Sequence, residues 1–144
     1  MIIGFTGRRG GMSDEQKESV QTLVEELAAS NEEAIFGLHG DCVGADAEFN
    51  EICLGLGLKT QIRPCTYENL RAFCEAEPIA LPKAPMKRNR DIVDDADVMI
   101  ACPPNYTEIK RGSGTWAAIK FTRRAKKPLY IVFPSGKIQK ENVE

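Results

Sequence analysis

The turn Gly112-Ser113-Gly114-Thr115 is the stretch of the sequence whose residue types most clearly suggest chemistry. It follows an apolar run, residues 98–102, and precedes residues 116–125, whose apolar side chains recur at helical spacing. Glycine lets the backbone approach a ligand closely, and Ser113 and Thr115 can cap the helix. Because the free N–H groups of a first helical turn attract anions, the turn predicts a phosphate site. A strand–helix turn that binds nothing would show the same pattern.

Three further segments carry glycine, arginine or carboxylate residues beside predicted strands and helices. They are Thr6–Gly11, Gly40–Asp46 and the pair Arg88-Asn89. In a parallel sheet with right-handed crossovers, the carboxyl ends of all strands lie at one edge, so these segments should meet the Gly112–Thr115 turn there. The residues predicted to contact a ligand are Gly7, Arg8, Gly40, Asp41, Gly44, Arg88, Asn89, Gly112, Ser113, Gly114 and Thr115.

Several of these side chains have both a functional and a structural interpretation. The planar guanidinium of Arg88 suits phosphate, but a solvated or salt-bridged arginine at a helix end is the alternative. Asn89 could contact a ribose or base edge, or cap a neighbouring loop. Arg8 and Arg9 could bind a second phosphate, or simply keep a glycine loop soluble. Asp41 is predicted to face a ligand hydroxyl.

Other polar and aromatic residues are predicted to be mainly structural. Asp46 should cap or brace the helix that follows it. His39 is predicted to be structural, and Trp116 to lie in the core, although a tryptophan at a helix start can also stack on a base or fill a subunit interface. Glu108, in the loop before the Gly112–Thr115 turn, is a further candidate carboxylate.

The alternation of apolar strands and amphipathic helices predicts the elements that position these residues. It favours a single α/β, Rossmann-like, three-layer domain with a mainly parallel five-stranded sheet of order 3-2-1-4-5. Residues 1–134 should form this domain, and residues 135–144 a polar, frayed tail. Residues 67–74 are predicted as a short helix, and the proline-rich stretch after them as a loop able to fold over a site. The predicted strands are residues 2–5, 34–38, 60–63, 98–102 and 129–133.

Composition narrows the possible functions. The chain has 144 residues and a net charge of -2, which gives no general attraction for nucleic acid or membranes. Its five cysteines form no C-x-x-C pair and it has one histidine, so neither a metal site nor a disulfide framework is predicted. No cofactor is predicted either. Reduced thiols and the lack of a leader-like start favour a cytoplasmic protein.

Four motifs in this order resemble one known superfamily. They are Gly40–Asp46, Arg88–Ile92, Ala96–Ala101 and Gly112–Thr115. Together they are similar to the SLOG superfamily of Rossmann-like domains, which is related to the lonely-guy cytokinin-activating hydrolases and to the DNA-processing protein Smf. The similarity is greatest to the small YspA-like branch, which is common in bacteria and their phages, and it spans about residues 2–133.

The resemblance implies a nucleotide-derived ligand and a homodimer or higher homo-oligomer. In lonely-guy enzymes a 5′-monophosphate sits on the glycine-rich turn, and a carboxylate three residues beyond the threonine helps to cleave the base–ribose bond. Here that position is Ala118. We therefore expect a sensor or sequestering module that holds its ligand. The alternative is a phosphoribohydrolase in which Asp41 or Glu108 replaces the missing carboxylate. Binding of single-stranded DNA, as in Smf, is disfavoured by the charge.

Overall fold

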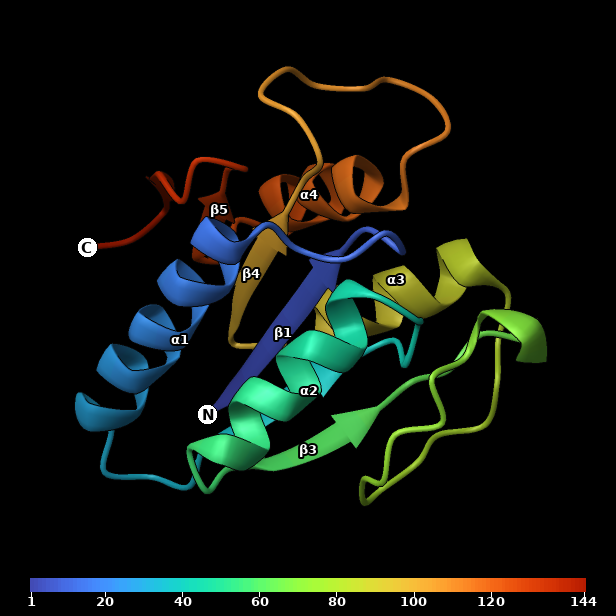
Figure 1. Ribbon diagram of the computed structural model, residues 1–144, viewed down its shortest axis with the longest axis horizontal. Helices are drawn as coiled ribbons and strands as arrows, with labels where there is room; N and C mark the ends of the chain where they lie inside the picture. Colours follow the sequence, from blue (N-terminus) through green and yellow to red (C-terminus); the bar gives the residue numbers. More distant parts are fainter.

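The computed structural model describes residues 1–144 and contains one twisted sheet between two pairs of helices (Figure 1). The strand order is β3-β2-β1-β4-β5-β6. The first five strands are parallel and β1 is central, pairing with both β2 and β4, so the predicted order is confirmed. The strands are β1 (Ile2–Gly7), β2 (Phe36–His39), β3 (Lys59–Ile62), β4 (Val98–Cys102), β5 (Leu129–Val132) and β6 (Ile138–Glu141).

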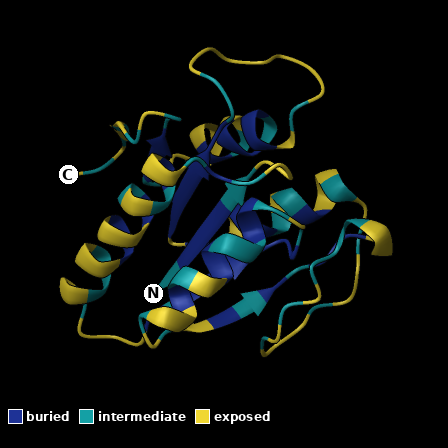
Figure 2. Cartoon of the chain, viewed as in Figure 1, coloured by how far each residue is buried: buried dark blue, intermediate teal, exposed yellow.

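Each face of the sheet is covered by two helices. The helices are α1 (Asp14–Ala29), α2 (Ala45–Gly55), α3 (Pro85–Asp95) and α4 (Gly114–Ala125). α1 and α2 pack on one face and α3 and α4 on the other, and each face has its own apolar core. Alternate residues of β4 enter the two cores, which explains why this strand is apolar throughout and fully buried (Figure 2). None of the four helices has the length and apolar character that a membrane span requires.

Local sequence signals account for where three of the helices begin. The Ser13 hydroxyl accepts a hydrogen bond from the Gln16 amide at 3.0 Å, and the Gln16 side chain accepts one from the Ser13 amide at 3.0 Å. This capping box fixes the start of α1. Pro85 occupies the first turn of α3, where its missing N–H costs nothing. Ser113 caps α4, as its sequence position predicts.

Three predictions about irregular regions were wrong. The expected frayed tail instead forms β6, which pairs antiparallel with β5 and is anchored by an ion pair between Arg123 and Glu141 at 2.8 Å. Residues 67–74 contain only a single 3₁₀ turn, η1 (Glu68–Leu70). The proline-rich stretch after η1 forms bridges along the edge of β3 rather than folding over a cavity.

Candidate functional site

A cavity of about 480 Å³ lies where the carboxyl ends of β1, β2 and β4 meet the starts of α3 and α4. We call it the strand-edge cavity. All four predicted segments contribute to its wall, so the expectation that they converge is confirmed. The predicted ligand residues that border it are Gly7, Arg8, Gly40, Arg88, Asn89, Gly112, Ser113, Gly114 and Thr115. Asp41 and Gly44, which were also predicted, do not border it.

The turn at the start of α4 leaves backbone donors unused. The Ser113 hydroxyl accepts from the Trp116 amide at 3.2 Å, and the Ser113 carbonyl accepts from the Ala117 amide at 3.1 Å. The amides of Gly114 and Thr115 have no partner within the protein, and both residues border the cavity. Gly112 has φ of +80°, which only glycine adopts easily. The positive end of the α4 dipole and two free N–H groups therefore adjoin the cavity.

The loop after β1 supplies two exposed cations to this cavity. Arg8 and Arg9 are both exposed, and neither forms an ion pair with a carboxylate. Arg8 uses only its Nε, which donates to the Gly11 carbonyl at 3.1 Å. Gly7 has a packing role, because a Cβ there would approach the Cβ of Ala45 to 2.5 Å. The loop thus brings two guanidinium groups to the same cavity as the α4 turn.

Arg88 is neither a free phosphate ligand nor a solvated or salt-bridged arginine, as the two interpretations of the sequence had it. It is buried, and its Nη1 donates to the carbonyls of Gly40 at 2.7 Å and Arg63 at 3.3 Å. Its Nε donates to the Asn89 Oδ1 at 2.8 Å. Most of its donors are therefore committed to holding the β2–α2 loop against α3, instead of to a phosphate. Asn89 keeps its Nδ2 free beside Gly114, where it can donate to a ligand.

Asp41 points away from the strand-edge cavity, so its predicted contact with a ligand hydroxyl is not supported. It is fully buried, and its Oδ2 accepts from the Arg71 Nε at 2.9 Å. Its Oδ1 accepts from the Cys74 amide at 2.8 Å. The carboxylate ties the β2–α2 loop to the segment that follows η1. A long-range partner of this kind cannot be recognised from the local sequence.

The remaining polar groups of the same loop are also satisfied within the protein. The His39 Nδ1 accepts from the Asp41 amide at 2.9 Å, so its Nε2 carries the proton and donates to the Asn50 Oδ1 at 2.8 Å. His39 is structural, as predicted. Gly44 starts α2 with φ of +88°, and a Cβ there would run into the Arg9 backbone. Gly44 therefore serves the close approach of two loops.

Asp46 is the one carboxylate in the wall of the strand-edge cavity. Its Oδ2 accepts from the Cys42 amide at 3.1 Å, so it braces the loop before α2, whereas the sequence predicted that it would cap or brace the helix. Burial raises the pKa of Asp46, and the nearby His39 and Arg88 partly offset that rise. Sequence reasoning did not place Asp46 next to a ligand, although its position in the first turn of α2 was a usable signal.

The loop between β4 and α4 separates the strand-edge cavity from Glu108. The indole Nε1 of Trp116 donates to the Asn105 Oδ1 at 2.8 Å, which fixes the start of this loop and buries the tryptophan as predicted. Glu108 borders a different cavity and lies 4.0 Å from Arg123. Ala118 is buried and borders neither cavity. None of Asp41, Glu108 and Ala118 therefore borders the strand-edge cavity.

Eight further residues that were not predicted to contact a ligand also border the strand-edge cavity. They are Phe5, Thr6, Cys42, Pro85, Met86, Ile92, Pro104 and Ile109. Burial raises the pKa of the Cys42 thiol to about 11, and the charge of Asp46 adds to the effect. Each of the eight lies in or close to a predicted strand or a predicted site segment, so proximity along the chain was the available signal.

Comparison with known proteins identifies the fold. No family model matches the sequence, and no curated protein matches it significantly. The molybdenum cofactor binding protein of the phototrophic bacterium Rippkaea orientalis is similar in structure, with a TM-score of 0.71 and 18% identity over 92% of this chain and 76% of that one. The structural genomics target TM1055 gives a TM-score of 0.62 and 14% identity over 89% and 71% of the two chains. The chain thus has a Rossmann-like fold.

Proposed function

We propose that the strand-edge cavity binds a small phosphate-bearing molecule of the nucleotide type. The observation that carries the proposal is the pair of unpartnered amides at Gly114 and Thr115, which border the same cavity as Arg8 and Arg9. A helix N-terminus attracts an anion, and guanidinium groups add charge-assisted hydrogen bonds. The volume of about 480 Å³ falls within the usual range for small-molecule sites.

The rest of the cavity wall supports a ligand larger than phosphate alone. Asn89 offers a free amide donor, and Phe5, Pro104 and Ile109 add apolar surface. A ring system with polar edges would fit such a mixture. The similar protein from Rippkaea orientalis is described as binding the molybdenum cofactor, which supports ligand binding by this fold. The resemblance to SLOG domains favours a nucleotide-derived ligand in the present chain.

We infer that the protein holds its ligand and does not turn it over quickly. Cleavage of a base–ribose bond requires charge stabilisation at the sugar and a proton for the leaving base. Ala118 cannot supply either, and Asp41 and Glu108 do not border the cavity. If the protein were instead a phosphoribohydrolase, Asp46 would be the carboxylate in the cavity wall that could act in the reaction. Its raised pKa favours a proton donor, but its Oδ2 is committed to the Cys42 amide.

Binding is tested by thermal shift and calorimetry with nucleoside 5′-monophosphates and the matching nucleosides. We expect at least one monophosphate to stabilise the protein, by about 2.7 kcal/mol at a hundred times its Kd, and its nucleoside to bind far more weakly. Substituting Arg8→Gln and Arg9→Gln together should weaken binding at least about tenfold, because charge-assisted hydrogen bonds are lost. The matched control, Lys59→Gln with Lys140→Gln, removes two exposed cations that do not border the cavity. Equal losses in the two variants would contradict the proposal.

Turnover is tested by incubating the protein with each monophosphate and assaying free base. We expect very slow or no release. Release at about one per second or more would show an ordinary enzymatic rate and overturn the inference. If Asp46→Asn then abolished that release while the protein still bound the monophosphate, the hydrolase alternative would be correct and Asp46 its acid.

A further inference from the structure

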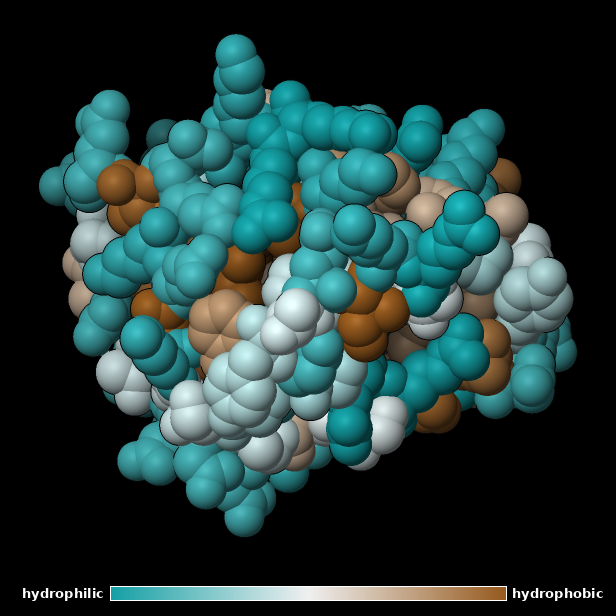
Figure 3. Space-filling view, turned by 90° about the horizontal axis from the view of Figure 1, so that it is seen from above, coloured by the Kyte–Doolittle hydropathy of each residue, from teal (hydrophilic) through white to brown (hydrophobic).

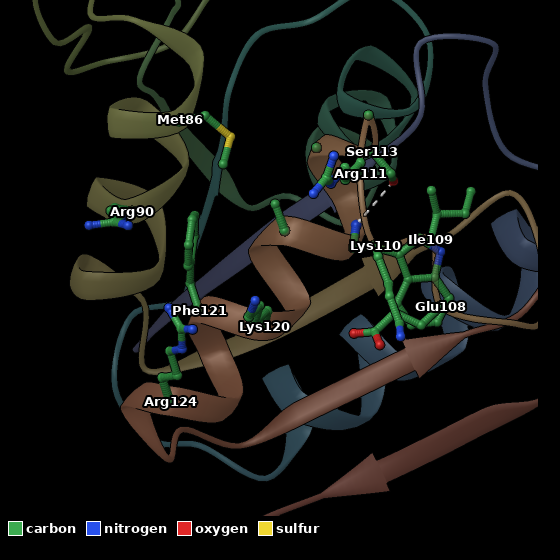
Figure 4. A pocket seen from close by; sticks show the side chains of 14 residues that line it. Met86, Arg90, Glu108, Ile109, Lys110, Arg111, Ser113, Lys120, Phe121 and Arg124 are labelled. Carbon is green, nitrogen blue, oxygen red and sulfur yellow. Dashed lines mark hydrogen bonds between the residues drawn. The ribbon is translucent and has the colours of Figure 1, made fainter.

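A second and larger cavity, of about 710 Å³, lies on the other side of the β4–α4 loop. We call it the α3–α4 cavity, because Arg90 of α3 and Lys120, Phe121 and Arg124 of α4 line it together with the loop (Figure 4). Arg8, Arg9 and Thr115 of the strand-edge cavity do not border it. The two cavities therefore share a wall near Gly112–Gly114 but differ in the side chains that would contact a ligand.

Cations dominate this second cavity. Its wall contains five cations from three separate segments, Arg90, Lys110, Arg111, Lys120 and Arg124. None of the five forms an ion pair. Some cations elsewhere in the chain do pair with carboxylates, as Lys17 does with Glu48 at 2.8 Å. α4 contains no acidic residue at all, and the only carboxylate of the wall, Glu108, lies beside Arg123.

Aromatic and apolar side chains line the same cavity as these cations. The guanidinium carbon of Arg90 lies 4.7 Å from the centre of the Phe121 ring, so stacking restricts the arginine. Met86 and Trp116 also line the cavity. Seen from above, the face that carries the β4–α4 loop is largely hydrophilic, with hydrophobic residues in small separate spots (Figure 3). This face shows no wide apolar patch of the kind that marks a protein–protein interface (Figure 3).

We propose that the α3–α4 cavity is a second ligand site, for a small molecule that carries two or more linked phosphate groups. Like charges that converge without counter-charges repel one another, and a bound polyanion removes that repulsion. Because the five cations are spread over three segments, one phosphate cannot reach them all, whereas a short phosphate chain can. The volume of about 710 Å³ suits a small ligand.

The charge of the other helix layer argues against a long nucleic-acid strand in this cavity. α1 and α2 carry a dense set of carboxylates and one cation. The carboxylates are Asp14, Glu15, Glu18, Glu25, Glu26, Asp46, Glu48 and Glu51, and the cation is Lys17. This acidic layer covers the opposite face of the sheet, so the basic surface that a long polyanion could follow is confined to one side, and the site favours a compact polyanion.

The test is calorimetric titration with inorganic tripolyphosphate, with orthophosphate and a short thymidine oligonucleotide as comparison probes. We expect tripolyphosphate to bind with strong salt dependence, and orthophosphate to bind at least about tenfold more weakly. Combining Lys120→Gln with Arg124→Gln should weaken tripolyphosphate binding at least about tenfold. Both side chains are exposed and unpaired, so the variant should keep its Tm.

Two control variants separate this site from the strand-edge cavity and from general charge. Arg8→Gln with Arg9→Gln, and Lys59→Gln with Lys140→Gln, should each change tripolyphosphate affinity less than about threefold. The proposal fails if tripolyphosphate does not bind, or if either control loses as much affinity as the α4 variant. It also fails if the oligonucleotide binds more tightly than tripolyphosphate at the same salt concentration, which would indicate a nucleic-acid surface.

Discussion

Two glycine-bearing loops that follow buried strands in this protein differ in whether their polar groups have hydrogen-bond partners within the protein. The Gly40–Asp46 loop is closed, because its carboxylates and the groups packed on it are hydrogen-bonded to one another. The Gly112–Thr115 turn is open, with two amides unpartnered beside a cavity. In the sequence both loops show the same signs of ligand binding. A glycine loop therefore indicates a binding site only when its polar groups are left without partners.

Long-range neighbours cause the difference. The Gly40–Asp46 loop is packed between α3, which supplies Arg88, and the segment after η1, which supplies Arg71 and the Cys74 amide. The side chain nearest to the Cβ position of Gly114 is the Asn89 amide, at 3.6 Å. The first loop therefore contributes to stability and the second is available to a ligand.

The largest effect on stability should come from breaking the Asp41–Arg71 pair. Arg71→Ala leaves a fully buried carboxylate without its charge partner. We expect the free energy of unfolding to fall by about 3–5 kcal/mol. Urea denaturation measures it, and a loss below about 1 kcal/mol would show that the closed loop is not held in this way.

Removing the donors of Arg88 should have the next largest effect. Arg88→Met keeps the length of the side chain but leaves the carbonyls of Gly40 and Arg63 without their donor. The expected loss of stability is about 2 kcal/mol, with the affinity for a monophosphate nearly unchanged in the folded protein. If the variant kept its stability but no longer bound phosphate, Arg88 would be a ligand-binding residue after all.

At the open turn, stability and binding should separate. Ser113→Ala removes the cap of α4 and should cost about 1 kcal/mol in urea denaturation. Ser113→Asp should preserve the cap, because aspartate is also a favourable N-cap residue, yet weaken phosphate binding through like-charge repulsion. Tighter phosphate binding by Ser113→Asp would argue against an anion at this turn.

The smallest effect concerns the reactivity of Cys42, which borders the strand-edge cavity from the closed loop. Burial and the charge of Asp46 raise the pKa of this thiol to about 11. Only the thiolate reacts, so alkylation by iodoacetamide should accelerate about tenfold per pH unit from pH 7 to pH 10. Peptide mass spectrometry measures the rate at each cysteine. A plateau near pH 8.5, the value for an ordinary thiol, would contradict the described environment.

Much of the fold could be predicted from the sequence because local signals and global topology agree. The apolar run at β4, the capping box at Ser13 and Pro85 at the start of α3 each mark an element correctly. β6 was missed because an exposed edge strand lacks the apolar pattern of a buried strand. This strand forms because residues 138–141 pair with β5, a contact that the local sequence does not show. The segment after η1 was missed because its order depends on the edge of β3.

The candidate site could be predicted only in part. Parallel topology correctly brings the four segments together, since it fixes where strands end and helices begin. Sequence cannot show which donors are already used, so Arg88 and Asp41 were assigned to a ligand although the fold consumes them. The α3–α4 cavity was missed for a related reason. Its cations are scattered along the chain, and only the packing of α3 against α4 makes them neighbours.

The most direct test of the contrast between the two loops is a titration of the ¹⁵N-labelled protein with inorganic phosphate at constant ionic strength, followed by amide chemical shifts. We predict saturating shifts at the amides of Gly114 and Thr115, which are the unpartnered donors. The amides of Asp41 and Cys42, which donate to His39 and Asp46, should shift little. Shifts that are larger in the Gly40–Asp46 loop than at Gly114 and Thr115, or no shift at either, would contradict the assignment of the open turn as the anion site.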